Sequence, residues 1–255
     1  MNSIDLNCDM GEIPEAVADG TQEALMPFLT SVNIACGGHA GDEFTMRTTV
    51  EQALRRNLAI GAHPGYPDRA NFGRLELDLS PDAITAAVFE QVSRLAEIAA
   101  KCGARISHVK AHGALYNQAA RDTAVAEALA TGVAQWRRDA IIVGLAGSPT
   151  LDIFRRAGLE VAAEAFADRR YEPDGSLRSR KFADALILDP KQAATQAVRI
   201  AENGGVIALD GAEIRAEAQT ICIHGDTPGA VKIAAAVAQR LKNAGIALRP
   251  LAAAS

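Results

Sequence analysis

Residues His108–Asn117 read HVKAHGALYN and contain a pattern that recurs along the chain. A short apolar run that begins at Ile106 ends in Lys110 and His112, and Gly113 follows at once. A run of this length is too short for an independent helix and is typical of a buried strand. Glycine permits the tight turn by which a chain leaves a strand. We therefore expect a strand over 106–110, followed by a turn that carries polar side chains.

The same order of elements recurs along the chain. Helix signals lie between the apolar runs: Ser80 precedes Pro81 at one helix start, and Gly103 follows the last apolar position of that helix. Further helices are expected to open at Asp189–Pro190 and at Thr227–Pro228. Strands that alternate with helices indicate βαβ units and a parallel sheet. The predicted strands are Ile4–Cys8, Val32–Cys36, Leu58–Ala62, Ile106–Lys110, Ile141–Leu145, Leu159–Glu164, Gly205–Leu209 and Thr220–His224.

Seven or eight such units favour a closed barrel over an open sheet. The chain has 255 residues of even composition, without a linker rich in Pro, Gly and Ser, and this favours one domain over residues 1–255. The predicted fold class is therefore α/β, a single-domain (β/α) barrel with seven or eight parallel strands. An open doubly wound sheet is the alternative.

Charge and composition exclude several classes of partner. A net charge of -5 argues against nucleic acid, which needs a basic surface. No run approaches the ~20 apolar residues of a membrane helix, and the N-terminus has no apolar signal core. Four cysteines without a CxxC pair do not form a disulfide framework, which favours a reducing compartment. We expect a cytoplasmic protein that binds neither nucleic acid nor membranes.

Four of the five histidines share one context, because each comes just after an apolar run and close to glycine. His108 differs: it precedes Lys110 within a strand, and we interpret it as structural. In a parallel barrel the carboxyl ends of the strands meet on one face, which holds the active site. The first run ends in Asp9, followed by Gly11. The sequence thus predicts one pocket formed by Asp9, His39, His63, His112 and His224.

Charged residues are expected at the same face. Glu164 ends a predicted strand, and Asp168 and Arg169 follow it in FADRRY. A lysine inside a strand is costly to bury unless it is paired or functional. Lys110 is therefore expected either to bind an anionic group or to pair with Glu164 or Asp9. The basic loop Arg169–Lys181 is either a carboxylate or phosphate clamp or a solvated charged loop.

Several nucleotide and hydrolase signatures are absent from the sequence. It contains no GxxxxGK[ST], no GxGxxG after a strand, no HExxH and no GxSxG. Any nucleotide is therefore bound without those loops or with the help of a partner.

Six segments in order resemble the LamB/YcsF family: DLNCDMGE, NIACGGHAGD, GAHPGYPDRANFGR, HVKAHGALYN, EAFADRRY and CIHGD. They extend from about Ile4 to Leu248. Ala111 departs from the family pattern, which often has Pro there, and Gly38 stands where an aromatic residue is common. The resemblance implies a distorted barrel similar to the polysaccharide-deacetylase-like barrel. It also implies the A-subunit role in an ATP-dependent 5-oxoprolinase, which cleaves 5-oxo-L-proline to L-glutamate together with subunits B and C.

The resemblance also implies a set of site residues and cofactors. We expect ATP as a cofactor, with a divalent metal either as Mg²⁺ on ATP or as an ion in the site. Asp9 or Glu164 would act as the base, the histidines would transfer protons or stabilise an oxyanion, and Lys110 and Arg169 would contact anions. The expected catalytic residues are Asp9, His39, His63, Lys110, His112, Glu164 and His224. The expected substrate contacts are Asn7, Asp42, Tyr116, Asp168, Arg169 and Asp226.

Two other functions stay open from the sequence. Asp9 with two of His39, His63 and His112 offers the ligand types of a metal-dependent amide hydrolase or deacetylase. The second is the function of a non-catalytic subunit that binds 5-oxoproline or organises its partners. Ala-rich helix faces are compatible with a homo-oligomer.

Overall fold

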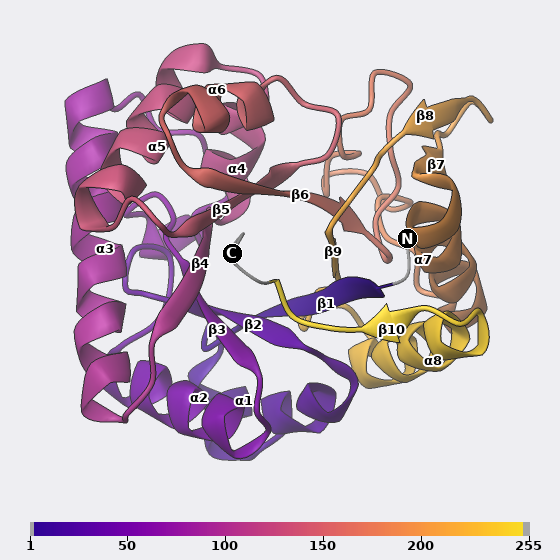
Figure 1. The fold of residues 1–255 in the computed structure, drawn as a ribbon, viewed down its shortest axis with the longest axis horizontal. Helices are drawn as coiled ribbons and strands as arrows, with labels where there is room; N and C mark the ends of the chain where they lie inside the picture. Colours follow the sequence, from indigo (N-terminus) through magenta and orange to yellow (C-terminus); the bar gives the residue numbers. More distant parts are fainter. Residues whose placement is uncertain (1–2, 252–255) are drawn as a thin grey trace.

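The computed structural model describes residues 3–251, and its centre is a closed barrel of parallel strands (Figure 1). Each strand pairs with the next along the chain, and β1 pairs with β9 through Asp5–Asn7 and Thr220–Cys222, which closes the ring. A short strand, β10 (Ala247–Leu248), pairs with the start of β1. The barrel strands are β1 (Ser3–Met10), β2 (Ser31–Ala35), β3 (Ala59–His63), β4 (Ile106–Lys110), β5 (Ile141–Leu145), β6 (Glu160–Phe166) and β9 (Thr220–Cys222).

Helices surround the barrel, as expected for βαβ units. Ser80 caps α3 and Asp189 caps α7, at the predicted starts of these helices. The last helix begins at Ala230, two residues after the Thr227–Pro228 signal, because Gly229 precedes it in a left-handed conformation. The helices are α1 (Pro14–Ala18), α2 (Glu43–Arg55), α3 (Pro81–Lys101), α4 (Gly113–Ala119), α5 (Thr123–Trp136), α6 (Thr150–Arg156), α7 (Pro190–Asn203) and α8 (Ala230–Asn243), with 3₁₀ turns η1 (Gln22–Phe28) and η2 (Arg69–Asn71).

One predicted barrel strand, Gly205–Leu209, lies outside the barrel. The segment forms β7 (Gly205–Ile207), which pairs antiparallel with β8 (Glu213–Arg215) in a separate hairpin. Its turn contains Gly211 at φ +88°, a conformation that favours glycine. Ile207 is 41% exposed, whereas barrel strands such as β2 and β5 are buried along their full length. The barrel thus has seven strands, the lower of the two predicted numbers.

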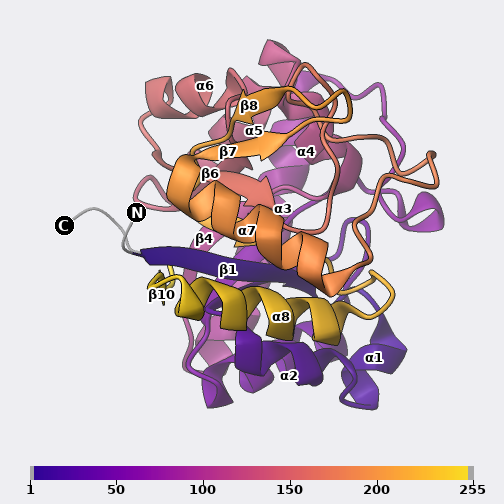
Figure 2. The same cartoon turned by 90° about the vertical axis from the view of Figure 1, so that its right-hand side faces the viewer.

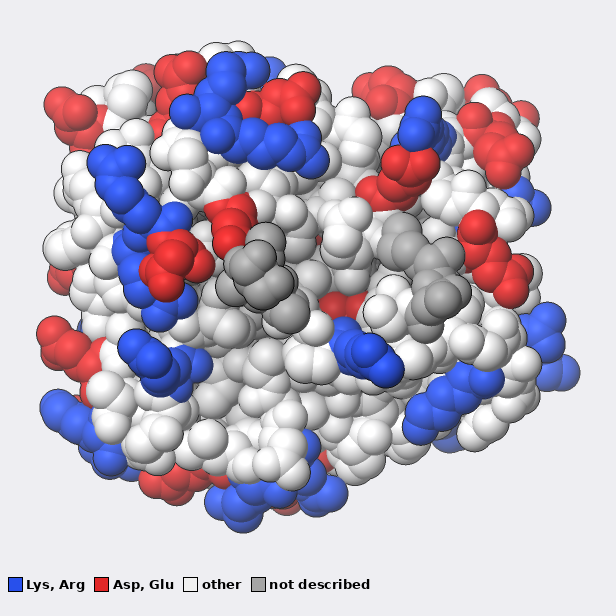
Figure 3. All heavy atoms as spheres, viewed as in Figure 1, with Lys and Arg blue, Asp and Glu red and all other residues white. Residues whose placement is uncertain are grey.

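All barrel strands run in the same direction, so the molecule has two different ends. In Figure 2 the strands run away from the end that carries both chain termini, and the long loop between β6 and α7 lies at the opposite, carboxyl end. Acidic and basic side chains are scattered over the face that this end presents (Figure 3). No helix within residues 3–251 is long and apolar enough to cross a membrane.

Helices α3 and α5 pack closely at a glycine. A Cβ atom placed on Gly132 of α5 would lie 2.7 Å from the carbonyl oxygen of Thr85 and 2.9 Å from the Cβ of Val88, both on α3. The Thr85 hydroxyl also donates a hydrogen bond to the carbonyl of Ala128 at 3.0 Å. The close approach therefore depends on the missing side chain.

Replacing Gly132 with valine should separate the two helices. We expect Gly132→Val to lower the free energy of unfolding by about 1–3 kcal/mol, the usual cost of overpacking. Denaturant unfolding followed by circular dichroism measures the change. Thr131→Val, at the exposed neighbouring position, is the control and should change stability by less than about 0.5 kcal/mol. Equal losses in both variants would show that close packing at Gly132 is not the cause.

Candidate active site

The ammonium group of Lys110 lies at the centre of the barrel's carboxyl end. Its Nζ atom is 3.0 Å from Asp9 Oδ1, 2.9 Å from Glu164 Oε1 and 3.1 Å from Cys222 Sγ. Lys110 is 2% exposed, and Glu164 is fully buried. Burial opposes the charge on Lys110, but the negative groups around it raise its pKa well above the usual value. Lys110 therefore contacts both of its predicted carboxylate partners, Asp9 and Glu164, at the same time.

A network of side-chain amides holds the carboxylates of Asp9 and Glu164 in place. Asn7 donates to Glu164 Oε1 at 3.0 Å, and Asn33 donates to Asp9 Oδ1 at 2.8 Å and to the side-chain oxygen of Asn7 at 2.8 Å. His108 Nε2 lies 2.8 Å from the side-chain oxygen of Asn33. Burial, together with the charge on Lys110, lowers the pKa of His108 to about 3, so its ring is neutral. His108 thus supports Asn33 from within the barrel, in agreement with its structural interpretation.

Three histidines converge on Glu12 beside this centre. His39 Nε2 lies 2.9 Å from Glu12 Oε1, and His112 Nδ1 lies 3.0 Å from the same oxygen. His63 Nε2 is 3.0 Å from His112 Nδ1 and 3.3 Å from Asp9 Oδ2. The rings of His39 and His112 stack with their centroids 3.6 Å apart. Asp9 therefore stands between the histidine cluster and Lys110, with one carboxylate oxygen toward each.

His224 approaches the same centre from the other side. Its Nδ1 atom is 2.9 Å from Asp168 Oδ1, and its backbone N–H donates to Asp168 Oδ2 at 3.0 Å. Thr227 donates to that second oxygen as well, at 3.0 Å. One His224 ring nitrogen lies within 4.8 Å of ligand atoms of Asp9 and Cys222. Both oxygens of the buried Asp168 are thus engaged, and this residue orients His224.

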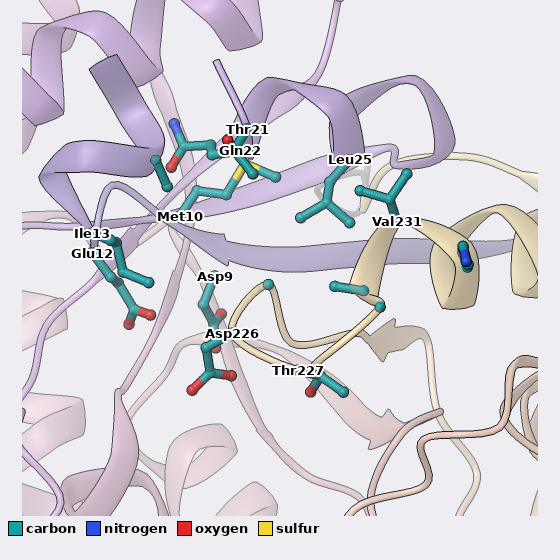
Figure 4. A pocket seen from close by; sticks show the side chains of 15 residues that line it. Asp9, Met10, Glu12, Ile13, Thr21, Gln22, Leu25, Asp226, Thr227 and Val231 are labelled. Carbon is teal, nitrogen blue, oxygen red and sulfur yellow. The ribbon is translucent and has the colours of Figure 1, made fainter. Parts of the chain in front are cut away.

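A cavity of about 320 Å³ opens beside Asp9 and Glu12. Figure 4 shows the carboxylates of Asp9, Glu12 and Asp226 toward one end of it and the apolar side chains of Leu25 and Val231 toward the other. The cavity thus has the carboxylates of Asp9, Glu12 and Asp226 on one side and an apolar wall formed by η1 and the start of α8 on the other.

Two arginines meet at Asp226 on the rim of this cavity. Arg74, from the loop after β3, lies 2.6 Å from Asp226 Oδ2, and Arg180, from the loop after β6, lies 2.7 Å from the same oxygen. Of the basic loop, Arg178 is engaged internally with Glu172 and Asp184. Arg180 is therefore a cation of this loop that reaches the rim of the cavity.

The predicted substrate contacts are placed differently from one another. Asn7 belongs to the amide network, and the hydroxyl of the buried Tyr116 has no hydrogen-bond partner among the described residues. Arg169 is buried and donates to the carbonyl of Arg178 at 2.6 Å. Asp42 lies outside the cluster: its carboxylate accepts the N–H of Thr45 at 2.8 Å and caps α2. Its position before a helix, three residues ahead of Thr45, is a capping signal.

Sequence reasoning missed Glu12, the carboxylate around which the histidines gather. Glu12 follows Gly11, whose φ of +73° turns the chain back over the barrel end. Glu12 therefore reaches the site from a loop and not from a strand end, where the strand pattern predicts the polar side chains. Its place at the end of DLNCDMGE is the signal that the sequence offers.

Comparison with known proteins agrees with this architecture. The model of the LamB/YcsF family matches residues 4–255, so the chain belongs to the LamB/YcsF family. Over 249 residues it is 52% identical to the A subunit of 5-oxoprolinase from Chloroflexus aggregans, covering 98% of this chain and 99% of that protein. The corresponding protein of Shouchella clausii is 46% identical, with 98% of each chain covered.

A solved structure shares the whole fold. The lactam utilization protein from Thermus thermophilus superposes with a TM-score of 0.90 at 39% identity, covering 98% of this chain and 100% of that one. The family resemblance and the barrel predicted from the sequence are both confirmed.

Removal of the Lys110 charge should destabilise the protein. Lys110→Met leaves two buried carboxylates without their cation, and we expect a loss of about 3–5 kcal/mol in the free energy of unfolding. Arg199→Met is the control, because the Arg199–Glu213 pair is largely exposed and should contribute less than about 1 kcal/mol. Urea unfolding at neutral pH measures both values. A Lys110→Met protein as stable as the control would mean that the carboxylates are not held as charges.

Proposed function

We propose that this chain is the A subunit of an ATP-dependent 5-oxoprolinase. The reaction opens the lactam of 5-oxo-L-proline to L-glutamate, with ATP hydrolysed to ADP and phosphate. The observation that carries the proposal is the buried Lys110, which lies between Asp9 and Glu164 at the carboxyl end of the barrel strands. The sequence of the chain is also 52% identical to that of a 5-oxoprolinase A subunit. A buried ion pair of this kind contributes little to stability, which favours a role in chemistry.

The chemistry requires groups that this pocket contains. The carbon of a lactam amide is a poor electrophile, and transfer of a phosphoryl group to the lactam oxygen would activate it for attack by water. Asp9 lines the cavity, whereas Glu164 is fully buried. We therefore assign Asp9 as the base for water and Glu164 as the anchor that fixes Lys110. His63 and Lys110 hold the pKa of Asp9 well below its usual value against the effect of burial.

Proton donation and anion binding follow from the other side chains. His224 is oriented by Asp168 and is the group we assign to protonate the leaving ring nitrogen. Arg74 and Arg180 are placed to meet the substrate carboxylate or a phosphate, because their forked donors match such anions.

The proposal includes partners, because the sequence has neither GxxxxGK[ST] nor GxGxxG after a strand. ATP, with Mg²⁺, would act in a complex with subunits B and C. A cytoplasmic location would give the complex access to ATP.

A second function is favoured by one observation, the group of Glu12, His39, His63 and His112. Imidazole and carboxylate are ligands of metal-dependent hydrolases. On this alternative the chain is an amide hydrolase that needs no ATP.

One assay separates the two functions. The chain is combined with subunits B and C and 5-oxoproline, and glutamate and ADP are measured with and without ATP. We expect glutamate and ADP in equal amounts, only with ATP and all three chains. Glutamate without ATP would support the metal-dependent hydrolase instead, and no glutamate from folded partners would contradict the 5-oxoprolinase proposal.

A single substitution tests the role of Asp9. Asp9→Asn keeps the shape and the acceptor oxygen for Lys110 but removes the base, and kcat should fall by roughly 10²-fold or more. Arg199→Met serves as the surface control and should keep full activity. An Asp9→Asn complex with wild-type turnover would remove Asp9 from the mechanism.

A further inference from the structure

The four residues Glu12, His39, His63 and His112 form a compact group of possible ligand atoms. One atom from each lies within 4.8 Å of the others. Glu12 Oε1 lies 2.9 Å from His39, 3.0 Å from His112 and 3.7 Å from His63, measured to the ring nitrogen of each. A tetrahedral Zn²⁺ with bonds of about 2.1 Å separates its ligand atoms by about 3.4 Å. The observed separations lie on both sides of that value.

The proton positions of two histidines point to a cation. His63 Nδ1 lies 2.8 Å from the carbonyl oxygen of Lys110, and His112 Nε2 lies 2.9 Å from that of Phe72. Carbonyl oxygens only accept hydrogen bonds, so these two nitrogens carry protons. When a ring is neutral its other nitrogen presents a lone pair, and these two atoms, His63 Nε2 and His112 Nδ1, lie 3.0 Å apart. With the Glu12 carboxylate beside them, at least three hydrogen-bond acceptors then lie next to one another with no donor between them.

This arrangement is the one that fixes metal-binding histidines in proteins. A ligating histidine commonly donates its second N–H to a backbone carbonyl, which sets the tautomer and aims the free nitrogen at the ion. His39 turns its Nε2 atom toward the same carboxylate oxygen of Glu12, at 2.9 Å. All three rings therefore turn one nitrogen toward the space beside Glu12, which is the orientation that a bound ion requires.

Two glycines allow the backbone to pack directly against the histidine rings, which limits the movement of the rings. A Cβ on Gly65 would lie 2.7 Å from His39 Nδ1, and a Cβ on Gly73 would lie 2.7 Å from the Cβ of His39 and 3.1 Å from His112 Cδ2. The Phe72 ring packs edge-on against both histidines, at 5.6 and 5.4 Å between centroids. The ligand atoms are thus held together by the surrounding chain.

Asp9 belongs to the neighbouring group. One of its oxygens is used by Lys110 and Asn33, and its ligand atom clusters with Cys222 and His224. Asp9 is therefore placed to act beside an ion held by Glu12 and the histidines, without being needed to hold it.

We propose that Glu12, His39, His63 and His112 bind one divalent transition metal ion of the Zn²⁺ class. Three imidazoles and one carboxylate suit Zn²⁺ or Co²⁺ and do not suit Mg²⁺ or Ca²⁺, which prefer oxygen ligands. Such an ion supplies Lewis acidity or an activated water next to Asp9. The proposal concerns binding by this chain alone, so it does not depend on ATP or on subunits B and C.

Metal binding by the purified full chain tests the proposal without an activity assay. The protein is stripped with a chelator and dialysed against Zn²⁺, and metal per chain is measured by mass spectrometry. Co²⁺ is titrated separately, because its visible spectrum reports the number of ligands. We expect one Zn²⁺ per chain and the intense visible bands of four- or five-coordinate Co²⁺. Absence of a bound ion at micromolar Zn²⁺ would overturn the proposal.

Variants assign the ligands. Glu12→Gln and His112→Gln should each weaken Zn²⁺ binding by at least the roughly 10–100-fold that loss of an outer-shell partner costs. Asp9→Asn and His224→Gln are the matched controls from the neighbouring group and should still bind one ion. Near-ultraviolet circular dichroism shows whether each variant is folded. If Asp9→Asn or His224→Gln loses the ion while folded His112→Gln keeps it, the neighbouring group is the metal site and the assignment is wrong.

Discussion

The rest of the site depends on one buried charge, the ammonium group of Lys110. It stands among Asp9, Glu164 and Cys222 at a point where seven strands end together. A lone ammonium ion cannot be buried there without a large desolvation cost. Its two carboxylates are in turn fixed by side-chain amides, so removal of the charge would disturb the whole network. This constraint explains why so many polar side chains point inward at one end of an otherwise apolar barrel.

The constraint divides the pocket into two chemically different halves. Asp9 joins them, with one oxygen toward Lys110 and the other toward His63. One half holds Lys110 and Glu164, and its charges are balanced within the protein. The other half holds three imidazoles and Glu12, and one side-chain atom of each lies within 4.8 Å of the others. Asp9 lies between the fixed cation Lys110 and the histidine cluster. On the proposed function, a base in this position is well placed to act on a bound water, and Asp9 is therefore given the central role.

The strand-end residues could be predicted because a parallel barrel brings the carboxyl ends of its strands together. Asp9, His63 and His112 follow from that rule alone. Glu12 was missed because it reaches the cluster from a loop that turns at Gly11, and a loop residue has no fixed direction in a sequence. Gly205–Leu209 resembles a barrel strand in composition, but the Asp210–Gly211 turn folds it into a hairpin. Sequence periodicity gives the type of element, whereas such contacts depend on turns and on tertiary packing.

On the proposed function, the charges of Asp9, Lys110 and Glu164 serve chemistry and not stability. The direct test is the unfolding free energy of Asp9→Asn/Lys110→Met/Glu164→Gln, measured beside Lys110→Met and together with glutamate formation in the complex. The triple variant keeps the amide contacts but contains none of the three charges. We predict that it recovers most of the stability lost in Lys110→Met, to within about 1 kcal/mol of the wild type, while forming no glutamate. A triple variant as unstable as Lys110→Met, or one that still forms glutamate at the wild-type rate, would contradict the account.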